Sequence, residues 1–520
     1  MRAPSSSRFV LLLTSVALAA AWLGWLGAAA LAQEAGDAGL SLFEAVRMTL
    51  SRDPNVAIDE ARVESSRGAL QIQSGRFDPV LSNSATSVDV EVPTGAGTSE
   101  ESRTFQNIVG VTQQLRTGLS IAPQLELLRT DDPSGPGAVN EGTLSFRVRQ
   151  PLLRGRGRSA TAAAEDSARL GVRAAELDLS QTLSLRVLTV AAQYWSAKAA
   201  LLNLEILLAS EASSRELLET TRRLIEADQT PAAEQVQLEA NLAAKESSRI
   251  GGERNLFAAK QDLGREIGLD GAEIAALALP ADPFPFLSPA EVPPVADAGP
   301  LVAEALENRA DLQAARERRE GVALLLGAAE NALKPQLDLI FTPSYSGLDE
   351  GAGAGSFFSP LYRNVPGLSS SLGFSLAWPL ANNQARGQLL QTQSALLQND
   401  LVVELLVKGI GADVPTALDA VRRNALQLDR AREAVRLFER AVVNEEKKLR
   451  AGTSTLLDVI SQRDRLTAAR QGEVSAHLAF ALSLLDLRFL TGTLLAADGD
   501  ASVVESSRLT TLPEREGETR

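Results

Sequence analysis

Two long stretches of the chain contain almost no helix breakers, and they constrain the fold more than any other feature. Residues 159–225 include a single glycine, Gly171, and residues 386–450 form a second stretch of similar length. At 1.5 Å per residue, a helix over the first stretch would be roughly 100 Å long. Apolar residues recur at three- and four-residue steps and widen beyond one stripe over residues 183–208. We therefore predict two very long helices, each packed on more than one side.

A short break and a returning helix follow each long stretch. The first break is EADQTPAAEQV, residues 226–236, and the second is RAGTSTLLDVI, residues 450–460. Small and polar residues interrupt the helical pattern in both, and apolar periodicity then resumes. The sequence thus predicts two helical hairpins, at about 159–268 and about 386–490.

The hairpins are preceded by segments with a different period. Residues 80–150 contain short runs of polar, β-branched and apolar residues, separated by clusters such as PTGAGTSEES and TDDPSGPG. These runs are typical of strands joined by turns, and TLSFRVRQ, residues 143–150, alternates cleanly between apolar and polar positions. A second strand region is predicted at about 336–378. Isolated strand pairs have unpaired edges, and a barrel that takes strands from several copies would remove those edges.

The order of these features occurs twice. SLGFSLAWPL, residues 371–380, mirrors TLSFRVRQPL, residues 143–152, which indicates internal duplication. This duplication predicts a first structural repeat at 33–269 and a second at 301–495, joined by a proline-rich connection at 270–300. A disordered tail is predicted at 496–520.

The N-terminus has the pattern of a secretory signal peptide. Arg2 and Arg8 precede an apolar run, and Ala30-Leu31-Ala32 provides small residues for cleavage, so residues 1–32 are predicted to be removed. The apolar run is long enough that an uncleaved anchor is the alternative. An exported protein with this signal is expected in the envelope of a bacterial cell.

Composition excludes several kinds of chemistry. The chain has no cysteine, one histidine (His477) and a net charge of −14. Disulfides and thiolate metal sites are therefore absent, and histidine-dependent hydrolase sites lack their residues. The acidic balance argues against nucleic acid as a partner. We expect a helix-packing role for His477, no cofactor, no metal and no enzymatic activity.

The chain resembles the outer-membrane efflux protein family, the TolC-like channel tunnels. The matching segments are LSLFEAVRMTLSRDPNV, the paired QPLLRGRG and WPLANNQARG, AGTSTLLDVISQRDRL and the closing LRFLTGTLL, in the family's order. The resemblance covers Leu40 to Leu495. It implies an α+β, mainly α, homotrimer in which long α-helical hairpins form a periplasmic α-barrel continuous with a transmembrane β-barrel. The family's barrel has twelve strands, four per protomer, whereas this sequence has four candidate strands in its first half alone. Residues 104–130 therefore lengthen the strands, add a hairpin or sit outside the membrane.

The resemblance also implies a function. The protein is expected in the cell outer membrane, extending into the periplasm, as a passive export duct of a tripartite efflux pump or a type I secretion system. The implied partners are a periplasmic adaptor (membrane fusion) protein, an inner-membrane transporter and outer-membrane lipid. The alternative is a periplasmic coiled-coil adaptor or scaffold without a pore, which would leave the alternating strands unexplained.

In this family the two breaks lie at the periplasmic mouth. Asp458 matches an aspartate that faces the axis, so three copies would form an acidic ring that attracts cations. Ser461 stands where relatives often have a second aspartate, and Glu234 holds a comparable place after the first break. Ordinary acids near the positive end of a helix are the alternative for Asp458 and Glu234. The residues expected to dock the adaptor are Asp228, Gln229, Thr230, Pro231, Ala451, Gly452, Thr453 and Ser454.

Overall fold

The computed structural model describes residues 39–95, 97–132, 137–227, 233–362, 367–495 and 506–513. The chain divides into two compact units. A helical unit comprises Met1–Ile58, Ser180–Ala310 and Val407–Arg520, and a sheet unit comprises Asp59–Leu179 and Asp311–Leu406. The predicted signal peptide lies outside the described residues. Among the helices that are described, none combines the length and the apolar character needed to cross a membrane.

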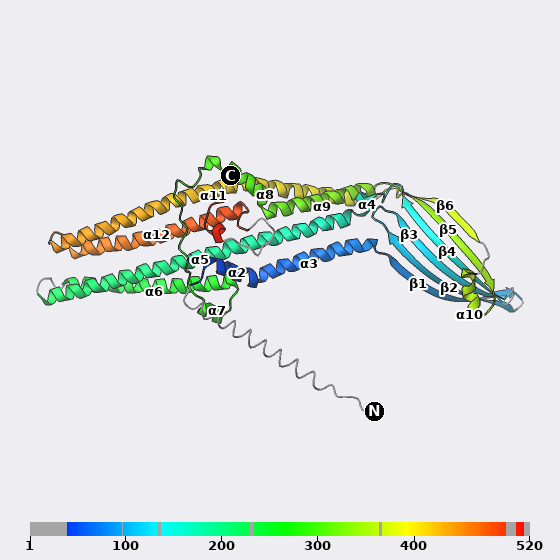
Figure 1. Cartoon of the computed structure of the whole chain (residues 1–520), viewed down its shortest axis with the longest axis horizontal. Helices are drawn as coiled ribbons and strands as arrows, with labels where there is room; N and C mark the ends of the chain where they lie inside the picture. The colour runs from blue at the N-terminus through cyan, green and yellow to red at the C-terminus, as the bar shows by residue number, and fades with distance from the viewer. Residues whose placement is uncertain are drawn as a thin grey trace, which may run out of the picture. The chain divides into compact units, whose positions relative to one another are not determined.

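Long helices dominate the helical unit, and two of them, α5 and α11, also contribute residues to the sheet unit (Figure 1). The elements with residues in the helical unit are α2 (Leu42–Arg52), α3 (Pro54–Ser74), α5 (Ala163–Glu226), α6 (Ala233–Ile267), α7 (Gly271–Ala276), η2 (Val295–Asp297), α8 (Gly299–Asn308), α9 (Ala310–Ala332), α11 (Asn383–Arg450), α12 (Leu456–Leu490) and η4 (Ser506–Leu509). Helices α5 and α11 have 64 and 68 residues, so both predicted long helices are present. Each is followed by a returning helix of 35 residues, α6 or α12.

The proline-rich connection contributes an aromatic side chain to the core of the helical unit. Phe284 stacks on Trp195 of α5 and on His477 of α12, with ring centroids 5.1 and 5.4 Å away. Trp195 and Tyr194 are fully buried, and the Tyr194 hydroxyl donates to the Leu40 carbonyl at 2.9 Å. The structure therefore places His477 in helix packing, as the sequence indicated.

Part of the C-terminal tail is ordered. Residues 506–513 contain η4, and Leu509 is buried. The Arg488 guanidinium donates to the carbonyls of Thr511 and Leu512 at 2.7 and 2.5 Å. The prediction of a disordered tail is wrong for this segment, because a buried arginine on α12 binds its backbone.

One antiparallel sheet of six strands makes up most of the sheet unit. The strands lie in chain order: β1 (Val80–Gly95), β2 (Thr98–Gln114), β3 (Ser120–Asp132), β4 (Gly137–Pro151), β5 (Gln336–Glu350) and β6 (Leu368–Ala377). Figure 1 shows them side by side. The short elements near them are η1 (Gly75–Phe77), α4 (Arg158–Thr161), α10 (Ala354–Phe358) and η3 (Ser359–Leu361). Four strands per protomer, which the family resemblance implied, is therefore wrong for this chain, because residues 104–130 add a hairpin.

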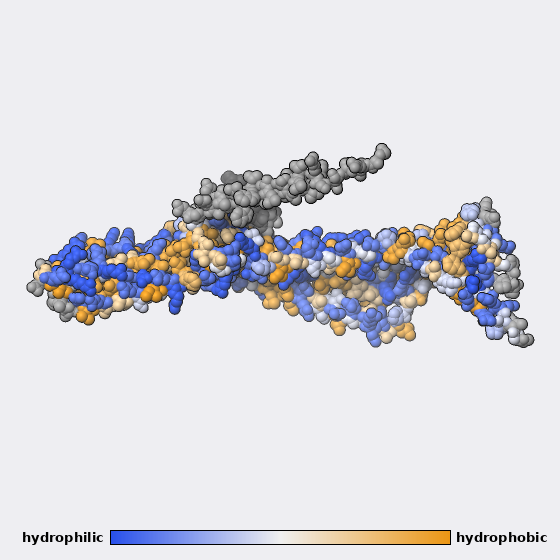
Figure 2. Space-filling model, turned by 90° about the horizontal axis from the view of Figure 1, so that it is seen from below, coloured by the Kyte–Doolittle hydropathy of each residue, from blue (hydrophilic) through white to orange (hydrophobic). Residues whose placement is uncertain are grey.

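The two faces of the sheet differ in polarity. Residues directly opposite on neighbouring strands share a face, so a row read across the ladders shows its character. One row on the first face, which we call the apolar face, is apolar from β2 to β6, with Val109, Leu125, Leu144, Tyr345 and Leu368, and it begins at the polar Asn83 on β1. The adjacent row on the polar face consists of Ser82, Gly110, Gln124, Ser145, Ser344 and Ser369. The alternation predicted for residues 143–150 is thus part of a pattern that crosses the sheet. Figure 2 shows hydrophobic residues gathered over part of the sheet beside hydrophilic ones.

Candidate functional site

The turn between α11 and α12 has a fixed backbone geometry. Gly452 has a φ of 73°, in the left-handed region that favours glycine. Its N–H donates to the Leu449 carbonyl at 3.0 Å, and the Thr453 N–H donates to the Lys448 carbonyl at 3.0 Å. This pair of bonds is a Schellman motif, which satisfies the last carbonyls of α11. The turn predicted from Gly452 is therefore present, with Ala451 as the first residue after the helix.

Asp458 takes part in the N-terminal cap of α12. The Thr455 hydroxyl and backbone N–H both bind the Asp458 carboxylate, at 2.6 and 3.1 Å, and the Asp458 N–H donates to the Thr455 hydroxyl at 3.3 Å. This reciprocal pair is a capping box. The hydrogen bonds from Thr455 lower the pKa of Asp458 below its ordinary value. Asp458 thus has a local structural role in one chain, whereas its role in an acidic ring stays a prediction.

Ser454 joins the two helices across the turn. Its hydroxyl donates to the Glu445 carboxylate on α11 at 2.5 Å, and this bond lowers the pKa of Glu445, with Lys448 contributing next. Ser461 lies one turn after Asp458 and is half-buried. The expected docking residues 451–454 therefore form an ordered turn.

The two breaks, residues 226–236 and 450–460, form the tips of the hairpins, and the first tip is described except for residues 228–232. Asp228, Gln229, Thr230 and Pro231 lie outside the described residues. Glu234 falls in the first turn of α6 and is half-buried. The hairpins meet in an apolar cluster of Leu218 on α5, Leu238 on α6 and Ile460 on α12. This cluster brings the first helical hairpin and the start of α12 together.

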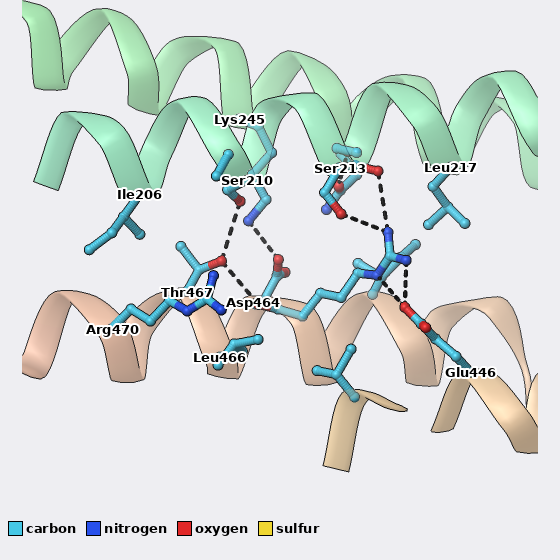
Figure 3. A pocket seen from close by; sticks show the side chains of 16 residues that line it. Ile206, Ser210, Ser213, Leu217, Lys245, Glu446, Asp464, Leu466, Thr467 and Arg470 are labelled. Atoms are coloured by element: carbon cyan, nitrogen blue, oxygen red, sulfur yellow. Dashed lines mark hydrogen bonds and ion pairs between the residues drawn. The ribbon is translucent and has the colours of Figure 1, made fainter. Parts of the chain in front are cut away.

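A cavity of about 170 Å³, lined by polar and apolar side chains, lies between the α5–α6 hairpin and the α11–α12 hairpin. Figure 3 shows side chains from both hairpins pointing into it. The residues that line it and bond to one another are Ser210 and Ser213 on α5, Lys245 on α6, Glu446 on α11, and Arg463, Asp464 and Thr467 on α12. We call these residues the inter-hairpin network.

Arg463 is the centre of the inter-hairpin network. Its guanidinium binds the Glu446 carboxylate through two nitrogens, at 2.6 and 3.2 Å. A third nitrogen donates to the Ser213 hydroxyl and carbonyl, at 2.8 and 3.2 Å. Beside it, the Lys245 ammonium binds the Asp464 carboxylate at 2.6 Å. Two charged side chains of the second hairpin, Arg463 and Asp464, are thereby tied to α5 and α6, and Glu446 holds Arg463 from within its own hairpin (Figure 3).

Sequence reasoning did not find this network. Arg463 and Asp464 lie in SQRDRL, where charges at successive positions look like an ordinary solvated helix face. Their partners are up to 250 positions away in the chain, and no local spacing connects them. Within the part of the chain that the structure describes, no cluster of carboxylates and histidine has the arrangement of a metal site.

Comparison with known families supports the resemblance seen in the sequence. Residues 301–493 match the family model described as outer membrane efflux protein. This match runs from within α8 to the end of α12 and includes the second tip and all the residues of the inter-hairpin network on α11 and α12. A search of curated protein sequences finds no match.

Solved structures share the fold across most of the chain. The CmeC outer membrane channel of Campylobacter jejuni superposes with a TM-score of 0.61 at 15% identity, covering 89% of this chain and 87% of that one. The outer membrane protein VceC of Vibrio cholerae gives 0.60 at 16% identity, with 87% and 96% covered. The open-state MtrE outer membrane channel of Neisseria gonorrhoeae gives 0.59 at 15% identity, with 87% and 88% covered. The chain therefore has the fold of these TolC-like channels.

Proposed function

We propose that this protein is a passive exit duct in the outer membrane, through which a tripartite efflux pump or a type I secretion system discharges its solutes. The observation that carries the proposal is the amphipathic sheet, together with the efflux-family match over residues 301–493. One face of this sheet carries an apolar row from β2 to β6, and such a face is stable where lipid covers it. The shared fold with outer membrane channels supports the same location.

The duct is proposed to be a homotrimer. A single sheet leaves the backbone groups of its two edge strands unpaired, and in lipid such groups must be satisfied by closure. Long helices that are apolar on more than one side also need neighbours. Three copies would join their sheets into one β-barrel and their hairpins into one α-barrel. The chain supplies a wall and a polar interior, and an inner-membrane transporter supplies the energy.

The tips are proposed to meet a periplasmic adaptor and to close the duct. Residues 228–231 and 451–454 would form the docking edge, and Asp458 would line the mouth. Within each protomer, the inter-hairpin network holds α12 against the first hairpin through Arg463 and Asp464. An iris-like opening that moves α11 and α12 away from α5 and α6 would have to break the Arg463–Ser213 and Lys245–Asp464 contacts.

A periplasmic adaptor or scaffold is the second candidate. It would use the helical hairpins equally well. It would also leave the apolar face of a six-stranded sheet in water, with exposed Leu372, Phe374 and Leu376 on β6 alone. The sheet therefore favours the duct.

The test is single-channel recording of the mature protein, residues 33–520, in planar bilayers, with ion selectivity measured. A duct gives discrete openings, and detergent-extracted outer membranes give trimers that dissociate on heating. A protein that stays in the periplasmic fraction and never inserts would contradict the proposal and support the scaffold.

A further inference from the structure

We propose that three copies of this chain build an eighteen-stranded barrel, in which β6 of one copy pairs with β1 of the next, and that its lumen is wide enough for large hydrated solutes. The inference rests on the trimeric duct proposed above. Six strands per copy give 3 × 6 = 18 strands, against the twelve that the family resemblance implied.

The added hairpin, β2 and β3, is an integral part of the sheet. Strand β2 pairs with β1 from Thr98 to Thr112 and with β3 from Arg103 to Gln114. Strand β3 pairs with β4 along its whole length, from Ser120 to Asp132. Both strands follow the same alternation of faces as their neighbours. A barrel that contains β1 and β4 therefore contains β2 and β3 between them.

The inner turn of this hairpin is fastened to the start of α5. Arg116 in the turn binds Glu165 through two nitrogens, at 2.6 and 2.7 Å, and Glu165 is buried. Gly118 has a φ of 93°, and a Cβ there would lie 2.1 Å from the Gly155 carbonyl oxygen. The Gly157 N–H donates to the Thr117 carbonyl at 2.9 Å. These contacts fix the hairpin at the point where the strands give way to helices.

The two outer strands are open edges within the described part of the chain. Strands β1 and β6 each pair on one side only. On β6 every residue is exposed, including Leu368 at 84% and Phe374 at 69%. Eight strands already enclose only enough room for side chains, so six strands closed on themselves would leave no lumen. The occupant of these edges is therefore the complementary edge strand of a second copy.

The connection between β5 and β6 lies on the apolar face of the sheet. Pro360 of η3 sits against Gly347 and Gly142, where a Cβ on Gly347 would meet the Pro360 carbonyl oxygen at 2.0 Å. Phe357 of α10 contacts Phe105 with ring centroids 5.6 Å apart. Both contacts are on the face that turns toward lipid in the duct. The described part of this connection therefore lies outside the lumen.

The polar face is lined by small side chains near the seam. On β6 its residues are Ser369, Ser371, Gly373, Ser375 and Ala377. Barrel diameter grows roughly linearly with strand number, and barrels of 16 to 18 strands enclose an aqueous channel. Eighteen strands in place of twelve widen the barrel by about 1.5-fold. A barrel of this width admits large hydrated solutes.

Cysteine pairs across the seam test the strand arrangement, because the native chain has no cysteine. Ser371→Cys on β6 is combined in turn with Ser82→Cys, Ser84→Cys or Thr86→Cys on β1, all on the polar face. After oxidation of outer membranes, one combination should give covalent dimers and trimers on denaturing gels. Ser344→Cys with Ser369→Cys is the positive control, since these neighbours within one chain should cross-link without forming oligomers. Ser145→Cys with Ser371→Cys, separated by β5, is the negative control.

Polymer exclusion tests the width. A variant that lacks residues 98–134 joins β1 to β4 and restores two strands in the first half, which gives a matched twelve-stranded duct. Neutral polyethylene glycols of graded size are added on the external side during single-channel recording. The native protein should admit polymers of about 1.5-fold larger radius than the variant does.

The outcomes separate this inference from the proposed function. Two results would overturn the eighteen-stranded barrel and leave the proposed duct standing. In one, the native protein and the deletion variant both conduct and exclude polymers of the same size. In the other, the protein forms conducting trimers but no β1–β6 cysteine combination cross-links. A protein that neither inserts nor trimerises would overturn both the barrel and the duct. If the deletion variant fails to assemble, the cysteine pairs decide the question alone.

Discussion

Arg463→Ala should loosen the mouth of the duct. The Arg463 guanidinium donates to the Ser213 hydroxyl and carbonyl on α5 at 2.8 and 3.2 Å, and the Arg463 side chain is only 29% exposed. Its two bonds to Glu446 stay within the α11–α12 hairpin, so opening does not break them. Hydrogen bonds to charged groups contribute about 1.5–3 kcal/mol each at most, and contacts that share one side chain are not additive. We therefore expect a loss of about 2–3 kcal/mol per protomer from the closed arrangement.

This energy has a measurable consequence if the network must break on opening. Each 1.4 kcal/mol changes an equilibrium tenfold, so one protomer's closed-to-open ratio should shift by about 30- to 150-fold. The assay is open probability in planar bilayers. Arg463→Lys keeps the charge but loses the planar fork, so it should give an intermediate shift.

Arg465→Ala is the matched control, because Arg465 is an exposed arginine on the same helix. It makes the same change of charge without touching the network. Equal open probability in Arg463→Ala, Arg465→Ala and the native protein would refute the reasoning, since the network would then play no part in closure.

Three further changes test other contacts. Asp458→Ala should cost about 0.5–2 kcal/mol of local stability by removing the capping box with Thr455, seen as faster amide exchange at the start of α12; if conductance and cation block are unchanged, Asp458 is a cap and not a gate. Burial, and secondarily a nearby guanidinium, lower the pKa of His477 from 6.5 to about 4. Between these pH values the folded state binds fewer protons than the unfolded state. The free energy of unfolding therefore falls as the pH drops through that window. His477→Phe should remove this dependence, which melting curves between pH 4 and 7 measure. Gly118→Ala should abolish insertion, because the added Cβ would clash with the Gly155 carbonyl at a positive φ; normal heat-labile trimers in this variant would contradict the fixed turn.

The helical part of the fold could be predicted from the sequence, because long helices depend on patterns among residues that are close in the chain. Almost unbroken stretches predicted α5 and α11, and the second hairpin, predicted to end at about 490, ends with α12 at Leu490. The turn at Gly452 was equally visible, since only a few residues adopt a left-handed backbone at low cost. These features depend on neighbours in sequence.

Features that depend on contacts between residues far apart in the sequence could not be predicted. The strand pattern left three alternatives for residues 104–130, because alternation shows a strand but not its partners; the ladders with β1 and β4 decide for a hairpin. In the sequence Arg463 is one of several charges on a helix, and only its contact with Ser213 distinguishes it. The ordered segment 506–513 was missed for the same reason, since a polar tail gives no sign of the arginine that binds it.

The β2–β3 hairpin belongs to the sheet, whereas the tips belong to the helical hairpins of the proposed duct. The number of strands can therefore change without a change in the tips. The family match covers residues 301–493, the half with only two strands, whereas β2 and β3 lie in the first half. An insertion between β1 and β4 begins and ends within the sheet, so it leaves the lengths of α5 and α6 unchanged. Every copy would add two strands to the barrel while the mouth keeps its four helices per protomer.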